Sequence, residues 1–293
     1  MDLVATRIAQ LGGTATTADI LDVVTEGTLR AALTRGAVHR HRRGVYGLTS
    51  LEGHAAQAAA IGATLSHRSA ALAHGWPVLH EPTRAELIVT PQRHLTAPDR
   101  RGRDVRYRQL AADDVDGART SPIRTVIDCA RDLPLAESLA VADSAVRTGD
   151  VALLDLAHAV EELPRTGRRR AMRVLSLASG ASSGPFESRL RAAAITATGD
   201  ESWVAQPELR FRDGRLRHPD VGHPALRIAL EADSHAHHKT RSDIVRDCHR
   251  YVEMGLTGWW VLRFAWEHVM QHDRWVHEVI ALAHTQRRAR RAS

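Results

Sequence analysis

The spacing of apolar residues predicts three short helices in the first 50 residues. The apolar positions recur at helical spacing: Val4, Ile8 and Leu11, then Ile20, Leu21 and Val24, then Leu29 and Leu33. The third helix is expected to begin near Thr25 or Glu26 and to stop at Gly36. Segment 38–46 then alternates around Gly44, which predicts a β-hairpin. Three helices and a hairpin form the plan of a winged helix-turn-helix, expected over residues 1–50.

That plan predicts DNA binding by two elements. The third helix would enter the major groove, and the hairpin would form a wing that meets phosphates. The candidate DNA-binding residues are Thr28, Arg30 and Arg35 in the helix and Arg40, Arg42 and Arg43 in the wing. The alternative is a solvated basic hairpin on a helical domain that docks onto another protein.

Residues 51–180 are expected to form a mixed α/β domain. The pattern predicts helices at 51–62 and 134–147 and strands at 85–90 and 104–108. Ser66 and His67 suggest a serine or histidine site, but no acidic residue stands at a recognisable spacing, so a helix start with a capping serine is favoured. The basic stretch 165–173 is expected to be a linker or a charged helix face.

Residues 181–293 predict a further α/β domain. Ser183-Gly184-Pro185 opens a helix with proline in the first turn. The expected strands lie at 209–212, 217–221, 227–233 and 259–264, and the expected helices at 242–254 and at the C-terminal end. Strand 217–221 is expected to pair with 227–233 around a Gly-His-Pro turn. The whole chain is therefore expected to be an α/β (α+β) protein of three domains.

Charge is the most informative feature of the composition. The chain has 40 basic and 34 acidic residues, a formal charge of +6 with histidine neutral, and Lys239 is its one lysine. Arginine favours forked contacts to phosphate and carboxylate, so the basic balance favours a polyanion partner. A genome that prefers arginine codons would explain the ratio of arginine to lysine equally well.

Cysteine spacing and hydropathy indicate the cellular setting. Cys129 and Cys248 lie far apart with no CxxC or CxxH spacing, which argues against a disulfide scaffold and a cysteine-based zinc site. No apolar run of about 18 residues occurs, and the first residues lack a basic leader followed by an apolar stretch. We therefore expect a cytoplasmic protein without a membrane segment.

Four acidic residues of the last domain could form a metal site. Glu187 lies on the opening helix, Asp220 near the end of one strand, and Glu231 and Asp233 at i and i+2 of the next. Because i and i+2 share a strand face, Asp220, Glu231 and Asp233 could converge as ligands of Mg²⁺ or Mn²⁺. Such a cation would activate water and neutralise charge on a phosphodiester. The alternatives are salt bridges to the many arginines and, for Glu187, attraction to the helix dipole.

Three histidines follow the acidic strand: His235, His237 and His238. Histidine there could serve as a general acid, a metal ligand or a phosphate contact. A zinc cluster is disfavoured, because sulfur ligands are missing and three near-consecutive histidines face one ion only across a sharp turn. A plain surface loop is the alternative.

Several segments between 183 and 270 match one family in combination. They are Gly-Pro-Phe-Glu-Ser-Arg-Leu (184–190), Gln206-Pro207, Pro219-Asp220-Val221, Glu231-Ala232-Asp233-Ser234 with His237-His238, Arg246-Asp247 to Arg250, and Gly-Trp-Trp-Val-Leu-Arg-Phe (258–264). This region resembles restriction-endonuclease-like domains related to the very-short-patch-repair endonucleases, of the PD-(D/E)XK superfamily.

The resemblance implies a role for each matching acid. It makes Asp220 and Glu231 metal ligands, Glu187 the helical acid, and Asp233 a further ligand or site acid. His237 or His238 would be an auxiliary catalytic group. The superfamily's usual lysine position holds Asp233.

The front of the chain resembles a second family. Arg-Arg-Gly-Val-Tyr (42–46), Ser-His-Arg-Ser-Ala-Ala (66–71) and Ser-Pro-Ile-Arg-Thr-Val-Ile-Asp (121–128) are similar to segments of type IV toxin–antitoxin antitoxins of the AbiEi kind. This resemblance implies an antitoxin-like winged helix and middle domain, with double-stranded DNA as partner and a toxin as a further candidate partner.

Two functions follow from these patterns. The first is a DNA-binding protein with a metal-dependent DNA endonuclease domain that hydrolyses phosphodiester bonds. The alternative is an antitoxin-like transcriptional regulator whose nuclease fold is catalytically inactive. The oligomeric state stays open.

Overall fold

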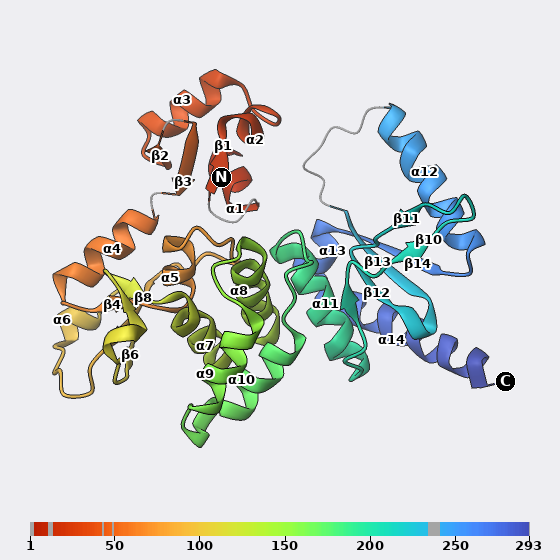
Figure 1. The fold of residues 1–293 in the computed structure, drawn as a ribbon. Coiled ribbons are helices and arrows are strands. Elements are labelled where there is room, and N and C mark those ends of the chain that lie inside the picture. Colours follow the sequence, from red (N-terminus) through yellow and green to blue (C-terminus); the bar gives the residue numbers. More distant parts are fainter. Residues whose placement is uncertain (1–2, 11–13, 43, 49, 234–240, 293) are drawn as a thin grey trace. The chain divides into compact units, whose positions relative to one another are not determined.

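The computed structural model describes residues 3–10, 14–42, 44–48, 50–233 and 241–292 (Figure 1). The chain is an α+β protein with several separate sheets, which confirms the expected fold class. It divides into two compact units, Met1–Gly180 and Ala181–Ser293. The further boundary at residue 50 stays a prediction. Across the described ranges, no helix combines the length and apolarity needed to cross a membrane.

The first 50 residues contain three helices and a small antiparallel sheet. The elements are α1 (Leu3–Gln10), β1 (Thr14–Thr16), α2 (Thr17–Leu21), α3 (Glu26–Thr34), β2 (Val38–Arg42) and β3 (Val45–Leu48), with strand order β1-β3-β2. Thr16 and Thr25 cap α2 and α3, because each hydroxyl accepts a backbone N–H three residues on. Ile8, Ile20 and Leu29 are buried in a common core. Strand β1, which the sequence pattern did not predict, completes the sheet.

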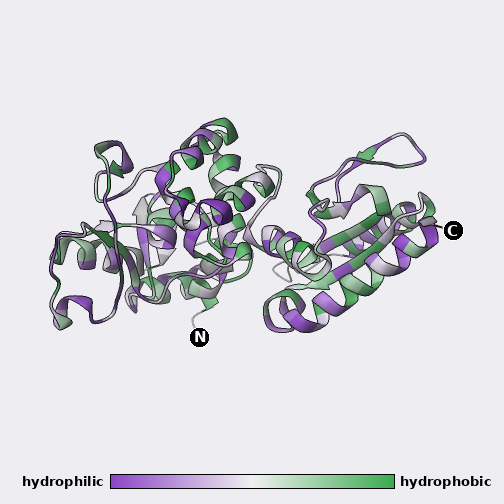
Figure 2. Cartoon of the chain, turned by 90° about the horizontal axis from the view of Figure 1, so that it is seen from below, coloured by the Kyte–Doolittle hydropathy of each residue, from purple (hydrophilic) through white to green (hydrophobic). Residues whose placement is uncertain are grey.

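The remainder of the first unit builds a five-stranded mixed sheet. Its strands are β4 (Thr64–Leu65), β5 (Ala85–Val89), β6 (Arg103–Tyr107), β7 (Val115–Asp116) and β8 (Arg119–Thr120), in the order β6-β5-β4-β8-β7. The helices are α4 (Ser50–Ala60), α5 (His67–Ala73), α6 (Ala97–Arg100), α7 (Pro122–Asp132), α8 (Leu135–Thr148), α9 (Leu153–Glu161) and α10 (Arg165–Leu177). Green and purple alternate along the helices in Figure 2, as expected for helices with one buried face. The basic stretch 165–173 lies within α10, so it belongs to a helix. The backbone leaves the helical conformation only at Thr166 and Gly167.

The second unit is built on a four-stranded mixed sheet. Its elements are α11 (Pro185–Thr198), β9 (Val204–Ala205), β10 (Leu209–Arg210), β11 (Leu216–Arg217), β12 (Val221–His223), β13 (Ile228–Asp233), α12 (Arg241–Leu256), β14 (Trp260–Ala265), α13 (Trp266–Gln271) and α14 (Asp273–Ala292). The strand order is β14-β13-β12-β9. Strand β13 runs parallel to β14 and antiparallel to β12. Met254 of α12 packs with Ala229 on one face, and Trp275 of α14 contacts Phe264 on the other.

The predicted strand 217–221 is wrong in one respect. Arg217 belongs to β11, which pairs with β10 in a separate two-stranded sheet. Strand β12 begins only at Val221 and pairs with β13. Pro219 explains the break, because proline has no N–H to donate to a ladder. Asp220 consequently stands directly before β12.

Candidate active site

Asp220 and Glu231 lie beside each other on the β12–β13 hairpin. The register pairs Val221 with Leu230, so the next position along sets Asp220 opposite Glu231. The Asp220 carboxylate accepts a hydrogen bond from the Ala232 backbone N–H at 2.7 Å. Glu231 is 4% exposed. The hairpin therefore brings two carboxyl groups together in a site where water solvates them poorly.

The surroundings of these two carboxyl groups oppose their ionisation. Burial and the negative charge of Glu187 raise the pKa of Asp220 to about 6. Burial and the charge of Asp220 raise the pKa of Glu231 to about 8, although Arg250 contacts Glu231 at 2.9 Å. A bound cation would remove this repulsion, and an all-oxygen donor set suits Mg²⁺ or Mn²⁺. The donor chemistry at Asp220 and Glu231 thus fits the expected ion.

Gln206 connects Glu187 to Asp220. Its side-chain amide donates to the Glu187 carboxylate at 3.1 Å and also hydrogen-bonds the Asp220 carboxylate. Glu187 further accepts the Ser183 backbone N–H at 2.9 Å. Gln206 has φ +48°, a left-handed conformation that costs about 1 kcal/mol or more outside glycine. The sequence marked Gln206 only as part of a matching segment, so its bridging position is a residue-level feature that the pattern missed.

The structure gives Asp233 a cationic partner. Its carboxylate contacts Arg263 of β14, and Arg263 also stands 3.6 Å from Asp247 and over the Tyr251 ring. The metal-ligand role of Asp233 stays a prediction, and within the described ranges Asp220, Glu231 and Asp233 do not bring their ligand atoms within 4.8 Å of one another. Arg250 contacts Glu231 and Arg263 contacts Asp233 instead.

Two predicted catalytic residues, His237 and His238, lie outside the described residues.

The predicted DNA-binding residues lie on α3 and in the β2–β3 hairpin. Arg30 and Arg35 are exposed on and after α3, and Arg30 pairs loosely with Glu26 at 3.3 Å. Thr28 is half-buried and its hydroxyl lies 2.9 Å from the Thr25 hydroxyl. Arg40 is exposed, with its guanidinium 5.9 Å from the centre of the Tyr46 ring. The side chain of Arg42 and all of Arg43 lie outside the described residues.

A different side-chain group has the spacing of a metal site. In the described part of the chain, Asp200, His223 and His284 bring their ligand atoms within 4.8 Å of one another. Asp200 contacts the Nε2 atoms of both histidines at 3.0 Å. Nδ1 of His223 accepts the Leu226 backbone N–H, so in the neutral ring Nε2 carries the proton and has no lone pair for a metal. Hydrogen bonds from both histidines and Ser202 outweigh burial and hold the pKa of Asp200 well below its usual range. We interpret the group as a structural cluster.

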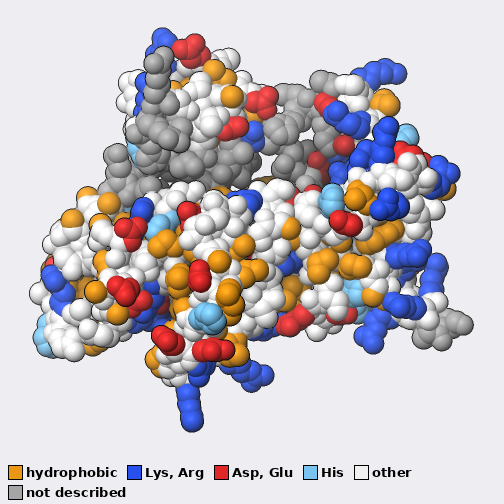
Figure 3. Space-filling model, in the orientation of Figure 1, with side chains coloured by type: hydrophobic (Ala, Val, Ile, Leu, Met, Phe, Trp, Pro, Cys, Tyr) orange, Lys and Arg blue, Asp and Glu red, His pale blue; other side chains and the backbone are white. Residues whose placement is uncertain are grey.

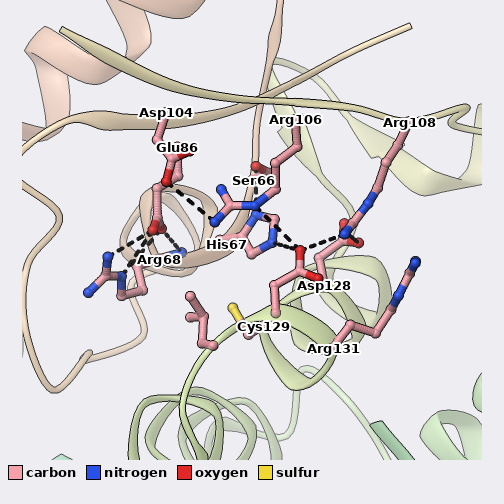
Figure 4. Close-up of polar contacts among 12 residues, drawn as sticks. Ser66, His67, Arg68, Glu86, Asp104, Arg106, Arg108, Asp128, Cys129 and Arg131 are labelled. Carbon is pink, nitrogen blue, oxygen red and sulfur yellow. Dashed lines mark hydrogen bonds and ion pairs between the residues drawn. The ribbon is translucent and has the colours of Figure 1, made fainter. Parts of the chain in front are cut away.

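The first unit contains a buried polar network that the sequence did not predict (Figure 4). His67 Nδ1 lies 2.9 Å from the Ser66 hydroxyl, and His67 Nε2 lies 2.8 Å from Asp132. The acidic partner of His67 therefore exists, 65 residues away, where spacing in the sequence gives no signal. The predicted helix does begin after Ser66, which occupies the N-cap of α5. The predicted capping by the serine side chain is wrong, because the Ser66 hydroxyl forms no cap hydrogen bond. Ser66 and His67 are both 0% exposed, so the pair is closed to a substrate.

Arginines complete this network. Arg108 contacts Asp128 and Asp132 at 2.5 Å each, and Arg106 approaches Asp132 at 3.4 Å. Burial opposes ionisation of Asp132, but His67 and Arg108 outweigh it and hold its pKa well below its usual range. The network thus joins α5, β6 and α7 through compensated charges.

Comparisons with known proteins give relatives without a described activity. No protein family model matches the chain. The chain is 28% identical over 148 residues to the uncharacterized proteins MT2308 and Rv2248 of two Mycobacterium tuberculosis strains. The match covers 49% of this chain and 53% of each relative, so the chain spans about half the length of the curated relatives it matches.

A solved structure gives a weaker similarity. The crystal structure of the RV2827C protein from Mycobacterium tuberculosis matches 71% of this chain and 87% of that chain at 16% identity. Its TM-score is 0.34.

Proposed function

We propose that this protein is a metal-dependent DNA endonuclease whose C-terminal unit hydrolyses phosphodiester bonds and whose N-terminal winged helix binds double-stranded DNA. The observation that carries the proposal is the Asp220–Glu231 pair on the β12–β13 hairpin, with Glu187 beside it. Repelling acids in a poorly hydrated site destabilise a fold unless a cation joins them. Arg250 supplies one positive charge there, so part of the repulsion is left for an added cation.

Each residue of the site has a distinct role in this proposal. Asp220 and Glu231 would hold Mg²⁺ or Mn²⁺, which supplies charge neutralisation at the phosphodiester and activation of water. Gln206 orients the Asp220 and Glu187 carboxylates through its amide. Arg250 fixes the Glu231 side chain through its hydrogen bond at 2.9 Å. The backbone N–H of Ala232 restricts Asp220 further.

Cleavage of supercoiled plasmid tests the nuclease. We expect nicking by the wild type with Mg²⁺ or Mn²⁺ and none in EDTA. Asp220→Asn and Glu231→Gln should lose cleavage to the EDTA background, because each removes one charged ligand. Glu278→Gln on the exposed surface of α14 is the matched control and should retain cleavage. Undiminished cleavage by Asp220→Asn, or cleavage that survives EDTA, would contradict the assigned site.

DNA binding by the winged helix is supported by exposed guanidinium groups. Arg30, Arg35 and Arg40 are exposed, and the Arg30–Glu26 pair is too solvated to hold Arg30 away from a phosphate. Phosphate contacts make affinity fall steeply with salt. In fluorescence anisotropy with a duplex, Arg40→Gln should reduce the salt slope by about one, whereas exposed Arg274→Gln should not. An affinity that does not depend on salt would contradict this assignment.

A second candidate function is an antitoxin-like transcriptional regulator with a toxin partner and an inactive nuclease fold. It is favoured by the ion pairs of Arg250 with Glu231 and of Arg263 with Asp233, which neutralise acids without a metal. Salt-dependent DNA binding with no cleavage under Mg²⁺ or Mn²⁺ would favour it. For either function we propose a cytoplasmic location, in keeping with the free thiols of Cys129 and Cys248.

A further inference from the structure

A cavity at the end of α14 is lined mainly by arginines. Its volume is about 490 Å³, within the range of about 300–1,000 Å³ that small-molecule sites occupy. The lining residues are Pro224, Ala225, Leu226, Arg227, Arg287, Arg290 and Arg291. Arginine side chains gather at the lower right of Figure 3, where α14 ends in the same view of Figure 1. Four of the seven lining residues are cationic and none is acidic.

Carbonyl groups and an aromatic ring, rather than carboxylates, hold these arginines. Arg287 donates to the Arg227 carbonyl at 3.0 Å and to that of Gly258, and Arg291 donates to the Ala225 carbonyl at 2.6 Å. Arg287 and Arg290 both stack on Trp260, at 4.9 and 5.1 Å from the ring centre. These contacts position the guanidinium groups without neutralising them.

The charges in the cavity are left largely uncompensated. Within the described part of the chain, none of the four arginines forms an ion pair with an acidic side chain. The C-terminal end of a helix offers only about half a negative charge against four positive ones. Burial and then repulsion from Arg290 and Arg227 lower the pKa of Arg287. An anion in the cavity would relieve this repulsion.

Arg227, which lines the cavity, has a strained backbone conformation. Arg227 has φ +52°, a left-handed conformation that a residue with a Cβ adopts at an energetic cost. It immediately precedes β13, whereas Glu231 and Asp233 lie toward the other end of that strand. At about 3.3 Å per residue, Arg227 lies roughly 13 Å from Glu231 and roughly 20 Å from Asp233 along the strand. The two sites are therefore separate.

We propose that this arginine-lined cavity binds a phosphate group, either of a DNA strand or of a free phosphate compound. Guanidinium groups match phosphate oxygens with paired N–H donors, and several around one cavity can share a doubly charged anion. The Trp260 ring keeps two of these groups in place before the ligand arrives, which lowers the ordering cost of binding.

Calorimetric titration of the full chain with inorganic phosphate tests the proposal. The titration is made in EDTA at constant ionic strength, so that it does not depend on cation binding by Asp220 and Glu231. We expect saturable phosphate binding that weakens about tenfold or more in the double variant Arg290→Gln/Arg291→Gln. The matched control Arg274→Gln/Arg288→Gln removes the same charge from the same helix, outside the cavity, and should change affinity by less than about twofold.

The outcomes separate this proposal from the nuclease. Absence of saturable phosphate binding by the wild type, or equal binding by the two double variants, would overturn the phosphate site whatever the plasmid assay gives. Displacement of phosphate by a short duplex from the wild type would identify DNA as the source of the phosphate group. Phosphate binding that a duplex leaves unchanged would identify a free phosphate compound instead.

Discussion

Half-buried Asp132 and buried Glu231 differ in the charged groups around them. Asp132 is surrounded by His67, Arg106 and Arg108, and these partners more than offset the cost of burial. At Glu231, burial and the charge of Asp220 outweigh Arg250 and raise the pKa to about 8. Compensated charge stabilises a fold, whereas uncompensated charge stores free energy that a ligand can release.

Glu231→Gln should stabilise the cation-free protein at high pH. In EDTA the folded wild type keeps a proton on Glu231 up to a pKa of about 8, while the unfolded chain releases it near 4.5. Stability should therefore fall as pH rises through this window, because the unfolded state binds fewer protons. The variant lacks this loss and should exceed the wild type by at least about 1 kcal/mol at pH 8.

Urea denaturation at pH 5 and pH 8, followed by tryptophan fluorescence, measures this difference. Five of the six tryptophans lie in the second unit, so the signal reports mainly on the part that carries Glu231. A variant that is less stable than the wild type at pH 8, or a difference that does not change with pH, would contradict the account of Glu231.

Asp132→Asn should destabilise the first unit by about 3 kcal/mol at pH 7, since it leaves His67 without its charged partner and Arg108 with Asp128 alone. The depressed pKa of Asp132 provides stability above its unfolded value near 3.8, and this stability is lost as pH falls below it. The difference between variant and wild type should thus narrow in acid. Circular dichroism during urea denaturation measures it, with exposed Asp155→Asn as control. An equal decrease in the free energy of unfolding in the two variants would contradict a stabilising role of the Asp132 network.

At the scale of elements, the β12–β13 hairpin shows what the sequence could and could not predict. The apolar run at 228–230 and the turn before it were enough to predict the buried strand and the convergence of Asp220 with Glu231. The break at Pro219 was missed because alternation alone does not register a lost N–H. Gln206 was missed as a bridge because its partners lie on two other elements. A sequence pattern describes one helix or strand, whereas the contacts of Gln206 depend on how separate elements pack together.

Gly222→Ala should destabilise the hairpin by about 2 kcal/mol. A Cβ at Gly222 would stand 2.7 Å from Pro207 Cγ and 3.3 Å from the Ile228 carbonyl oxygen. Gly255→Ala in α12 is the matched control, because nothing lies within 4 Å of its Cβ and alanine favours a helix by about 0.5–1 kcal/mol. Thermal unfolding should therefore move in opposite directions in the two variants. An unchanged melting temperature in Gly222→Ala would contradict the close packing of β12.

For the whole molecule, the sequence predicted more of the architecture than of the chemistry. Periodicity and turn residues were sufficient for the α+β class and for most helices and strands. Salt bridges to arginine were an alternative for Glu231 and Asp233, but the sequence did not identify which arginine pairs with which acid, because Arg250 and Arg263 come from α12 and β14. The same holds for the arginine cavity, which gathers residues about 60 positions apart. Long-range assembly decides which charges are paired, and it therefore decides where ligands can bind.

Binding of Mn²⁺ is the decisive test of a metal site on the β12–β13 hairpin, because it requires no knowledge of the DNA substrate. Millimolar Mn²⁺ should raise the melting temperature of the wild type over an EDTA baseline, since a ligand that binds the folded state stabilises it by mass action. The double variant Asp220→Asn/Glu231→Gln should lose this rise, and Glu278→Gln should keep it. No rise in the wild type, or an equal rise in the double variant, would contradict a metal site on the β12–β13 hairpin.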